Sequence, residues 1–280
     1  MSTPRVAAIH DMSGFGRCSL TVAMPILSVM GLQCCPVPTA SLSTHTGGFQ
    51  GFTFLDMTDE MPKIAAHWKS LDLEFQSIYS GFLGSERQIH IVEDFIRTFR
   101  GKDTIVVVDP VMGDHGEVYQ TYTPAMCAGM AHLATQADVI TPNLTEAALL
   151  LDVPYSTLPT GESGCKEIVE RLSLNGQRSV VLTGASAAPA LTGAMCFDAK
   201  TGHSELIQTQ RVPREFFGTG DVFSSVLTGA LVRGDSLVDA TRQAVDFIRA
   251  CAERTAAKEM PMREGVDFEP LLGLLLPHNE

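Results

Sequence analysis

A run of β-branched residues near the middle of the chain limits the fold more than any other segment. Residues 104–108 are Thr-Ile-Val-Val-Val, and Asp109 and Pro110 follow them. A strand without a polar face must be covered on both sides, which is typical of a parallel sheet between two layers of helices. The run therefore predicts a central strand of an α/β fold, with Asp109 at its carboxyl end.

Segments with strand and helix patterns alternate along the rest of the chain. Strands are predicted over 5–11, 33–41, 77–82, 139–141 and 178–183, and an antiparallel pair within 191–212 around a turn at 200–202. Helices are predicted over 20–30, 59–69, 85–99, 165–174, 221–233 and 237–257, with further starts at Pro124 and Asn143, a glycine turn at 13–16 and a tail helix over 268–276. Without an internal repeat or linker, residues 1–280 are expected to form one domain with a mainly parallel central sheet and helices on both faces.

The composition excludes several classes of partner. The chain has 20 Lys and Arg against 32 Asp and Glu, a formal net charge of −12, so it lacks the basic face that nucleic acid or an anionic membrane requires. No segment reaches the roughly 18 apolar residues that span a bilayer, and the N-terminus lacks signal-peptide features, so a cytoplasmic location is expected. The seven cysteines contain no C-x-x-C pair, which favours inert thiols.

Polar residues follow nearly every predicted strand. They are Asp109, Asp114, Asn143, Glu146, Thr183 and the segment 218–221. In open α/β sheets the carboxyl ends of the strands share one edge, where ligands bind, so we expect these residues to converge. Asn143 and Glu146 have the spacing of a helix capping box, and Glu146 could instead face a metal ion. Both interpretations stay open at this point.

The segment Gly218-Thr219-Gly220-Asp221 joins a loop to an apolar helical pattern that begins at Val222. The unpaired N–H groups and the positive end of the helix dipole at such a junction can bind a phosphoryl group. An acid at Asp221 would repel that anion unless it has a proton to remove, which indicates a general base. The competing interpretation is that Thr219 or Asp221 only caps the helix.

These motifs together resemble the ribokinase-like superfamily and, within it, the pyridoxal kinases. The segments 109–114, 141–146 and 218–221 carry the resemblance to the superfamily. Residues 41–47 (Ser-Leu-Ser-Thr-His-Thr-Gly) are similar to the Ser-Asn-His-Thr-Gly loop of the pyridoxal kinases. Residues 80–85 (Ser-Gly-Phe-Leu-Gly-Ser) are similar to their Ser-Gly-Tyr-Leu-Gly-Ser segment. The resemblance extends from Val6 to the helix after Asp221.

The resemblance implies ATP-dependent phosphorylation of the 5'-hydroxymethyl group of pyridoxal, pyridoxine or pyridoxamine. Asp221 would be the general base, while the backbone amides of residues 218–220 hold the charge on the transferred phosphoryl group. The residues implied in catalysis are Gly218, Thr219, Gly220 and Asp221. Those implied on the ATP side are Asp109, Asn143, Thr183, Gly184, Thr219 and Gly220. Those implied at the substrate are Asp11, Ser13, His45, Thr46, Phe82 and Asp221.

The resemblance also implies cofactors and an assembly. Mg²⁺ bound to the ATP phosphates would be reached by Asp114 and Glu146, directly or through waters. A monovalent cation such as K⁺ is a further expected cofactor. The segment 115–123, which has no periodicity, is expected to close over the substrate as a flap. A homodimer is expected, with neither nucleic acid nor membrane as a partner.

The chain departs from the family at two positions. It has Asp11-Met12-Ser13 where the family has a serine and a longer turn after the first strand. An acid suits a cationic group, so we hypothesise that Asp11 contacts the pyridine nitrogen or the ammonium group of pyridoxamine, and that pyridoxamine is preferred. Phe82 replaces the family's tyrosine, which keeps a stacking face and loses a hydroxyl.

Two alternative functions stay open. A hydroxymethylpyrimidine kinase of thiamine synthesis would share the ATP side and differ in the substrate loops. A non-catalytic ligand-binding protein on the same fold is the other, because a fold alone does not prove activity. Asp221 weighs against the second alternative, since a pure anion binder has no use for an acid at that position.

Overall fold

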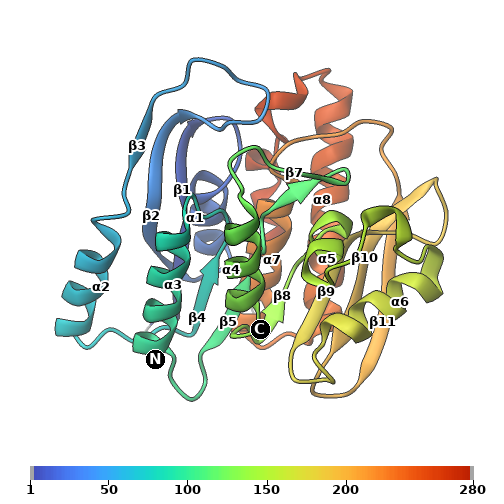
Figure 1. The fold of residues 1–280 in the computed structure, drawn as a ribbon. Coiled ribbons are helices and arrows are strands. Elements are labelled where there is room, and N and C mark those ends of the chain that lie inside the picture. Colours follow the sequence, from blue (N-terminus) through green and yellow to red (C-terminus); the bar gives the residue numbers. More distant parts are fainter. Residues whose placement is uncertain (1–2, 278–280) are drawn as a thin grey trace.

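The computed structural model describes residues 3–277 and contains one nine-stranded sheet with helices on both of its faces (Figure 1). The strand order is β11-β10-β9-β8-β5-β4-β1-β2-β3. The strands are β1 (Arg5–Phe15), β2 (Gln33–Thr44), β3 (Phe54–Asp56), β4 (Ser77–Ser80), β5 (Ile105–Val108), β8 (Val139–Ile140), β9 (Ser179–Ala185), β10 (Leu191–Asp198) and β11 (His203–Gln210). The continuity of this sheet supports the proposal of a single domain.

The centre of the sheet is parallel and its edges are antiparallel. β1 pairs in parallel with β2 and β4, and the parallel pairing continues through β5 and β8 to β9. β10 and β11 form the antiparallel hairpin expected within 191–212, and β3 adds an antiparallel strand at the opposite edge. The predicted fold class, a mainly parallel sheet covered on both faces, is confirmed.

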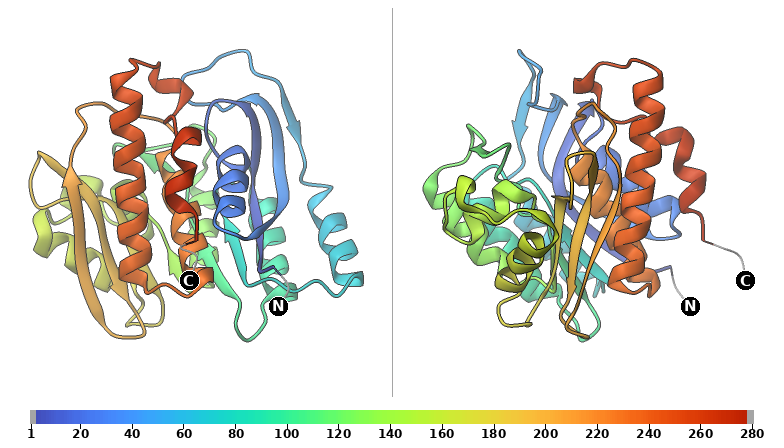
Figure 2. Two further views of the ribbon diagram at one scale, coloured as in Figure 1. Left: turned by 180° about the vertical axis from the view of Figure 1, so that it is seen from behind. Right: turned by 90° about the vertical axis from the view of Figure 1, so that its right-hand side faces the viewer.

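The helices form two layers, which lie on either side of the sheet in the view turned by 90° (Figure 2, right). One layer contains α2 (Met61–Ser70), α3 (Glu86–Phe99), α4 (Pro124–Ala134), α5 (Leu144–Leu150) and α6 (Gly161–Leu172). The other contains α1 (Leu20–Val29), α7 (Thr219–Arg233), α8 (Leu237–Ala257) and the short 3-10 helix η3 (Glu269–Leu275). Among residues 3–277, no helix combines the length and the apolar character needed to cross a membrane.

The strand β5 shows why a run of β-branched residues belongs at the centre of this sheet. Val106 and Val108 point into the apolar layer under α3 and α4, while Val107 points into the layer under α1 and α7. All three side chains are fully buried. A polar residue at any of these positions would be taken out of water without a partner, so the sequence leaves no polar face.

The first strands are longer than the sequence patterns predict. β1 continues to Phe15 and β2 to Thr44, and Phe15 still pairs with Thr44, so the turn expected at 13–16 is wrong. The pairing is irregular between His10 and Met12, where β2 contains one residue more than β1. Such a bulge changes the direction in which the following side chains point. The edge strand β3 was not predicted, because three exposed residues are too few to show a period.

Two other segments differ from expectation. Part of the segment expected to be an irregular flap forms a small hairpin of β6 (Gly113–Asp114) and β7 (Glu117–Val118). His115 and Gly116 at its tip have φ values of 53° and 82°, as a two-residue hairpin turn requires. The tail expected as one helix over 268–276 is the 3-10 helix η3.

Candidate functional site

The predicted ATP-side residues are brought together at the carboxyl edge of the sheet. The Thr183 backbone N–H at the end of β9 donates to the carbonyl of Pro142 at 2.8 Å. The Asn143 side-chain amide donates to the carbonyl of Gly113 at 2.9 Å. Gly184, next to Thr183, has a left-handed φ of 72° and open space where a side chain would lie. The expected convergence of the strand ends β5, β8 and β9 is therefore confirmed as an arrangement of the chain.

The helix α7 begins without a side-chain cap. Gly218 occupies the N-cap position with φ 73° and ψ 4°, and no side chain accepts a hydrogen bond there. The interpretation that Thr219 or Asp221 merely caps the helix is therefore wrong. The first N–H groups of α7 have no partner within the helix, and they lie where the helix dipole is positive. This start of α7 can bind an anion.

The side chain of Asp221 bonds to the residue before α1 and does not cap its own helix, α7. The Ser19 backbone N–H donates to Asp221 Oδ2 at 2.9 Å, and the Asp221 side chain is 16% exposed. Burial raises the pKa of Asp221 to about 7, the negative charge of Asp11 adds to this shift, and the Ser19 hydrogen bond opposes it. A carboxyl group that titrates near neutral pH is suited to accept a proton in catalysis.

His10 lies directly beneath Asp221, and sequence analysis did not single it out. Its Nδ1 is 3.9 Å from Asp221 Oδ1, and within residues 3–277 neither ring nitrogen has a hydrogen-bond partner. Burial lowers the pKa of His10 to about 3, so the imidazole is neutral and the contact is not an ion pair. The ring packs edge-on against Tyr79 at 4.3 Å, and a side chain at Gly81 would lie only 2.3 Å from it.

Asp109 is a second buried carboxyl group near the start of α7. Ser224 Oγ donates to Asp109 Oδ2 at 3.1 Å, and Thr141 Oγ1 lies 2.9 Å from the same hydroxyl. Burial and the charge of Asp221 raise the pKa of Asp109 to about 7. A β-carbon at Gly220 would lie 3.9 Å from Asp109 Oδ2, which places the segment 218–221 beside this carboxyl group.

Asn143 and Glu146 form the capping box that their spacing suggested. Asn143 Oδ1 accepts from the Glu146 backbone N–H at 2.9 Å, and Glu146 Oε2 accepts from the Asn143 N–H at 2.8 Å. Glu146 Oε1 accepts from the Met112 N–H at 3.2 Å. Burial, together with the charge of Asp109, raises the pKa of Glu146 well above its ordinary value. The capping interpretation is confirmed, and it does not exclude a contact with a cation.

The expected metal contacts of Asp114 and Glu146 stay a prediction. The Asp114 side chain is 53% exposed, and its Oδ1 accepts from the His115 N–H at 2.8 Å. Within the part of the chain that the structure describes, no group of three or more His, Cys, Asp or Glu residues is arranged to hold a metal ion by itself. The buried carboxyl groups of Asp109 and Glu146 nevertheless carry raised pKa values, so their surroundings fit a cation that arrives with ATP.

Two residues expected to contact the substrate, Asp11 and Ser13, have buried side chains. Asp11 is 6% exposed, and its two oxygens accept from Ser13 Oγ at 2.7 Å and from Ser19 Oγ at 2.5 Å. Ser13 is fully buried. The structure therefore does not support direct contact of Asp11 or Ser13 with a substrate, and the expected preference for pyridoxamine loses its basis. The hydrogen bonds from Ser13 and Ser19 explain the difference, because they use both oxygens of Asp11 within the chain.

His45 also uses both of its ring nitrogens for hydrogen bonds within the chain, so neither is free to bind a ligand. The Gly47 N–H donates to its Nδ1 at 3.1 Å, so Nε2 carries the proton and donates to the carbonyl of Arg263 at 2.7 Å. His45 thus links the loop after β2 to the C-terminal segment. The neighbouring Thr46 is exposed and remains available to a ligand.

Phe82 follows β4 and is half-buried at the candidate site. Its ring lies 6.1 Å from the ring of Tyr122, measured between centroids. The remaining exposed part of the ring offers a flat apolar face. Stacking of Phe82 on a substrate ring stays a prediction.

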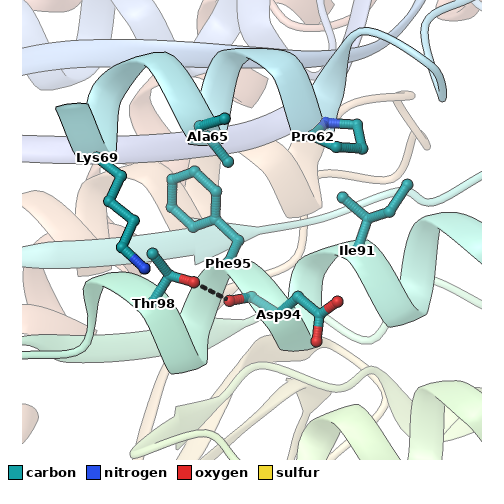
Figure 3. Close-up of a pocket in the computed structure, with 8 residues that line it drawn as sticks. Pro62, Ala65, Lys69, Ile91, Asp94, Phe95 and Thr98 are labelled. Atoms are coloured by element: carbon teal, nitrogen blue, oxygen red, sulfur yellow. Dashed lines mark hydrogen bonds between the residues drawn. The ribbon is translucent and has the colours of Figure 1, made fainter.

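A pocket between α2 and α3 lies apart from all of these residues (Figure 3). Its walls are formed by Pro62, Ala65, Ala66, Lys69, Ile91, Asp94, Phe95 and Thr98. None of the predicted site residues belongs to this pocket. The candidate site is therefore defined by the strand ends and the start of α7.

Comparison with known proteins places the chain in a family. The profile of the phosphomethylpyrimidine kinase family matches residues 25–265. The chain belongs to this family. The pyridoxine/pyridoxal/pyridoxamine kinase of Bordetella avium (strain 197N) is 30% identical over 275 residues, which cover 92% of this chain and 90% of the relative.

Solved structures agree with this family assignment. A Bacteroides thetaiotaomicron VPI-5482 protein, assigned to the phosphomethylpyrimidine kinases and crystallised with pyridoxal, has a TM-score of 0.92 and 46% identity, covering 98% of this chain and 96% of that one. The pyridoxal kinase of Lactobacillus plantarum has a TM-score of 0.89 and 31% identity, covering 98% and 97%. The fold and the family that the sequence motifs implied for this chain, those of a ribokinase-like vitamin B6 kinase, are therefore confirmed.

The residues missed by sequence analysis left weak signals or none. His10 is a polar residue inside an otherwise apolar strand, which is a signal of a special role. Ser224 follows Asp221 by three residues and so lies on the same face of α7. Ser19 gives no sequence signal, because only the fold brings the start of α1 to Asp221.

Proposed function

We propose that this protein transfers the γ-phosphoryl group of ATP to the 5'-hydroxymethyl group of a vitamin B6 vitamer: pyridoxal, pyridoxine or pyridoxamine. The observation that carries the proposal is the Asp221 carboxyl group beside the uncapped start of α7. Relatives named as kinases of all three vitamers, and a similar structure that contains pyridoxal, support this class of substrate.

Asp221 is proposed to act as the general base. The hydroxyl oxygen of the vitamer attacks the γ-phosphorus of ATP, its proton passes to an Asp221 oxygen, and the bond between the γ-phosphorus and the bridging oxygen breaks to release ADP. A pKa of about 7 leaves a large fraction of the carboxyl groups ionised at neutral pH and still able to bind a proton. The hydrogen bond from Ser19 keeps one oxygen fixed and leaves the other for the substrate.

The start of α7 is proposed to hold the phosphoryl group during transfer. The backbone N–H groups of Gly218, Thr219 and Gly220 point along the helix axis toward the loop side, where the helix dipole is positive. Gly218 must lack a side chain, because a β-carbon there would lie 1.9 Å from the Arg17 carbonyl oxygen. Negative charge that develops on the transferred group would be stabilised by donors that need no rearrangement.

The ATP side is proposed to include Asp109, Asn143, Thr183 and Gly184. Asp114 and Glu146 would reach Mg²⁺, directly or through waters, and a monovalent cation such as K⁺ is a further proposed cofactor. Magnesium bound with ATP supplies positive charge that offsets the charge on the phosphates. The raised pKa of Glu146 supports this proposal, since a buried carboxyl group beside another acid is ionised more easily next to a cation.

The substrate side is proposed to include Thr46, Phe82 and the segment 115–123. The Thr46 hydroxyl can donate a hydrogen bond to the vitamer or accept one from it, and the ring of Phe82 offers a face on which the pyridine ring can stack. The side chains of Val118 and Tyr119 after the hairpin turn are exposed, and they would cover a bound ligand when the segment closes. We also propose a homodimer in the cytoplasm, and the exposed Phe54 and Leu55 of the edge strand β3 are consistent with a covered surface.

Hydroxymethylpyrimidine kinase activity is the second candidate function, because the matching family profile is that of the phosphomethylpyrimidine kinases. A panel assay separates the two candidates. ADP release would be measured with Mg²⁺-ATP and, in turn, pyridoxal, pyridoxine, pyridoxamine and hydroxymethylpyrimidine. We expect a kcat/KM for at least one vitamer that is about tenfold or more above that for the pyrimidine, equal to about 1.4 kcal/mol of transition-state discrimination. A higher kcat/KM for the pyrimidine would replace the proposal by the second candidate.

A further inference from the structure

Ser19, the residue before α1, has a backbone conformation that residues with side chains rarely adopt. Its φ is 52° and its ψ is −135°, and its side chain does not cap the helix. Strain of this kind costs on the order of 1–3 kcal/mol and persists only where the surrounding structure imposes it. The surroundings of Ser19 therefore need an explanation.

Ser19 connects two carboxyl groups that are distant in sequence. Its backbone N–H donates to Asp221 Oδ2 at 2.9 Å, and its hydroxyl donates to Asp11 Oδ1 at 2.5 Å. The other Asp11 oxygen accepts from Ser13 Oγ at 2.7 Å, so Asp11 is itself fixed in place. Both donors of Ser19 are thus used on the side of the candidate site.

The chain just before Ser19 is clamped by two glycines. A β-carbon at Gly218 would lie 1.9 Å from the Arg17 carbonyl oxygen, and one at Gly265 would lie 3.0 Å from the same atom. The Arg17 side chain is held in turn by Glu269 at 2.8 Å. The start of α7 and the C-terminal segment therefore both pack closely against Arg17, which leaves Ser19 little freedom to relax.

We propose that Ser19 is a positioning residue for the phosphoryl transfer, and that Asp11 holds Ser19 in its strained conformation so that its N–H fixes the Asp221 carboxyl group. The inference rests on the proposed function, because it assigns the two residues to the base of that reaction. It gives the buried Asp11 an indirect role. Asp11 acts through Ser19 and through its charge.

The groups that face Asp221 determine how its titration should respond. On β1 these are neutral His10 and the charged Asp11, and before α1 the thiol of Cys18, whose pKa burial raises far above its ordinary value. On β4 Tyr79 faces it, with a pKa raised by burial, and after β5 Asp109 faces it, with a pKa of about 7. Removing the charge of Asp11 should lower the pKa of Asp221, and withdrawing the Ser19 N–H should raise it.

The test compares Ser19→Ala, Ser19→Gly and Asp11→Asn with the wild type. Ser19→Ala removes the anchor and keeps the strain, so the N–H should withdraw and kcat should fall about 10- to 100-fold with little change in the KM for ATP. Ser19→Gly removes the same anchor but tolerates the conformation, so it should retain more kcat than Ser19→Ala. Asp72→Gly is the matched control, because Asp72 has a similar φ of 51° at the end of α2 and should keep the wild-type kcat.

A second readout does not depend on turnover. The Asp221 carboxyl group is titrated by ¹³C NMR in the ligand-free protein, with Asp221→Asn used to assign its signal. We expect its midpoint to move to lower pH in Asp11→Asn and to higher pH in Ser19→Ala. Unchanged midpoints in both variants, or a kcat for Ser19→Gly below that of Ser19→Ala, would overturn the inference. If the wild type phosphorylates no substrate while both midpoints move as expected, the proposed function fails, and what stands is that Ser19 and Asp11 fix the Asp221 carboxyl group.

Discussion

Asp221 combines properties that seldom occur together in one carboxyl group. It lies in the first turn of a helix, where the dipole favours its ionised form, yet burial and the charge of Asp11 raise its pKa to about 7. An acid kept for structure would gain from a low pKa and a capping bond, and Asp221 has neither. Its surroundings suit a group that accepts a proton and releases it again.

Replacing Asp221 by asparagine tests this role at the scale of one residue. Asp221→Asn keeps the size of the side chain and an acceptor for the Ser19 N–H, and it removes the ability to take a proton. We expect kcat to fall about 10²- to 10⁴-fold, the usual contribution of a general base, while the KM for ATP changes little. Steady-state kinetics with a B6 vitamer and Mg²⁺-ATP measure both constants.

The matched control for this substitution is Asp235→Asn at the other end of α7. Asp235 follows the helix and pairs with Arg233 at 3.2 Å, so its loss should leave kcat within about twofold of the wild type. Turnover of Asp221→Asn close to that of the wild type would show that another group takes the proton.

Single residues show where sequence reasoning about the site stops. Asp221, Asp109 and Asn143 could be found because each follows a strand or starts a helix, and such positions meet at one edge of a parallel sheet. The expected roles of Asp11, Ser13 and His45 depended on side chains that were free to reach a ligand, whereas Asp11 is bound to Ser13 and Ser19, and His45 to Arg263. Contacts across about 200 residues, such as Ser19 with Asp221, leave no local pattern.

At the scale of one element, α5 combines a cap with the candidate ATP side. Asn143→Ala removes the capping bond to Glu146 and the bond to the Gly113 carbonyl, which ties the β6–β7 hairpin to α5. We expect the free energy of unfolding to fall by about 1 kcal/mol and the KM for ATP to rise. Denaturant unfolding and steady-state kinetics measure the two effects.

Ser236→Ala at the start of α8 provides the comparison for this cap. Ser236 Oγ accepts from the Asp239 N–H at 3.1 Å, so its loss should lower stability by a similar amount without affecting ATP. An equal KM in both variants would mean that Asn143 serves the helix alone.

Elements with a clear apolar pattern were predicted well, and very short exposed elements were not. The stripe of α3 repeats over 14 residues and so defines its buried face, while β5 is recognised by its unbroken apolar run. The three-residue β3 and the two-residue strands β6 and β7 are set by pairing with neighbours that sequence analysis cannot place. The ends of β1 and β2 were underestimated for the same reason, since their pairing with each other continues through polar residues.

At the scale of the whole molecule, the site makes stability depend on pH. Asp109 and Asp221 have folded-state pKa values of about 7 against an ordinary value of 3.8. Between these values the folded protein keeps protons that the unfolded chain has released, so stability falls as pH rises from about 4 to about 7. His10 acts in the opposite direction, because its pKa of about 3 lies below the ordinary 6.5 and folding excludes its proton in that range.

A difference between two proteins separates these opposing contributions. Asp109→Asn keeps an acceptor for the Ser224 hydroxyl and removes one buried titrating group, while His10 is the same in both proteins. Below about pH 4 Asp109 is protonated in both the folded and the unfolded chain, and the two proteins should have similar free energies of unfolding. Near pH 8 the wild type must keep a buried charge, so Asp109→Asn should be the more stable of the two, and removing this charge also makes ionisation of Asp221 easier.

Urea unfolding of both proteins across this pH range measures the difference, with Asp152→Asn on the exposed surface as the control. The difference in the free energy of unfolding between wild type and Asp109→Asn should grow as pH rises toward about 7. It should then level off, because the carboxyl groups of Asp109 and Asp221 are both ionised above that value. A difference that stays constant with pH would mean that Asp109 is ionised throughout. Any fall in stability toward neutral pH would then have to come from other groups, and the buried Asp109 would give no reason for a cation to bind beside it.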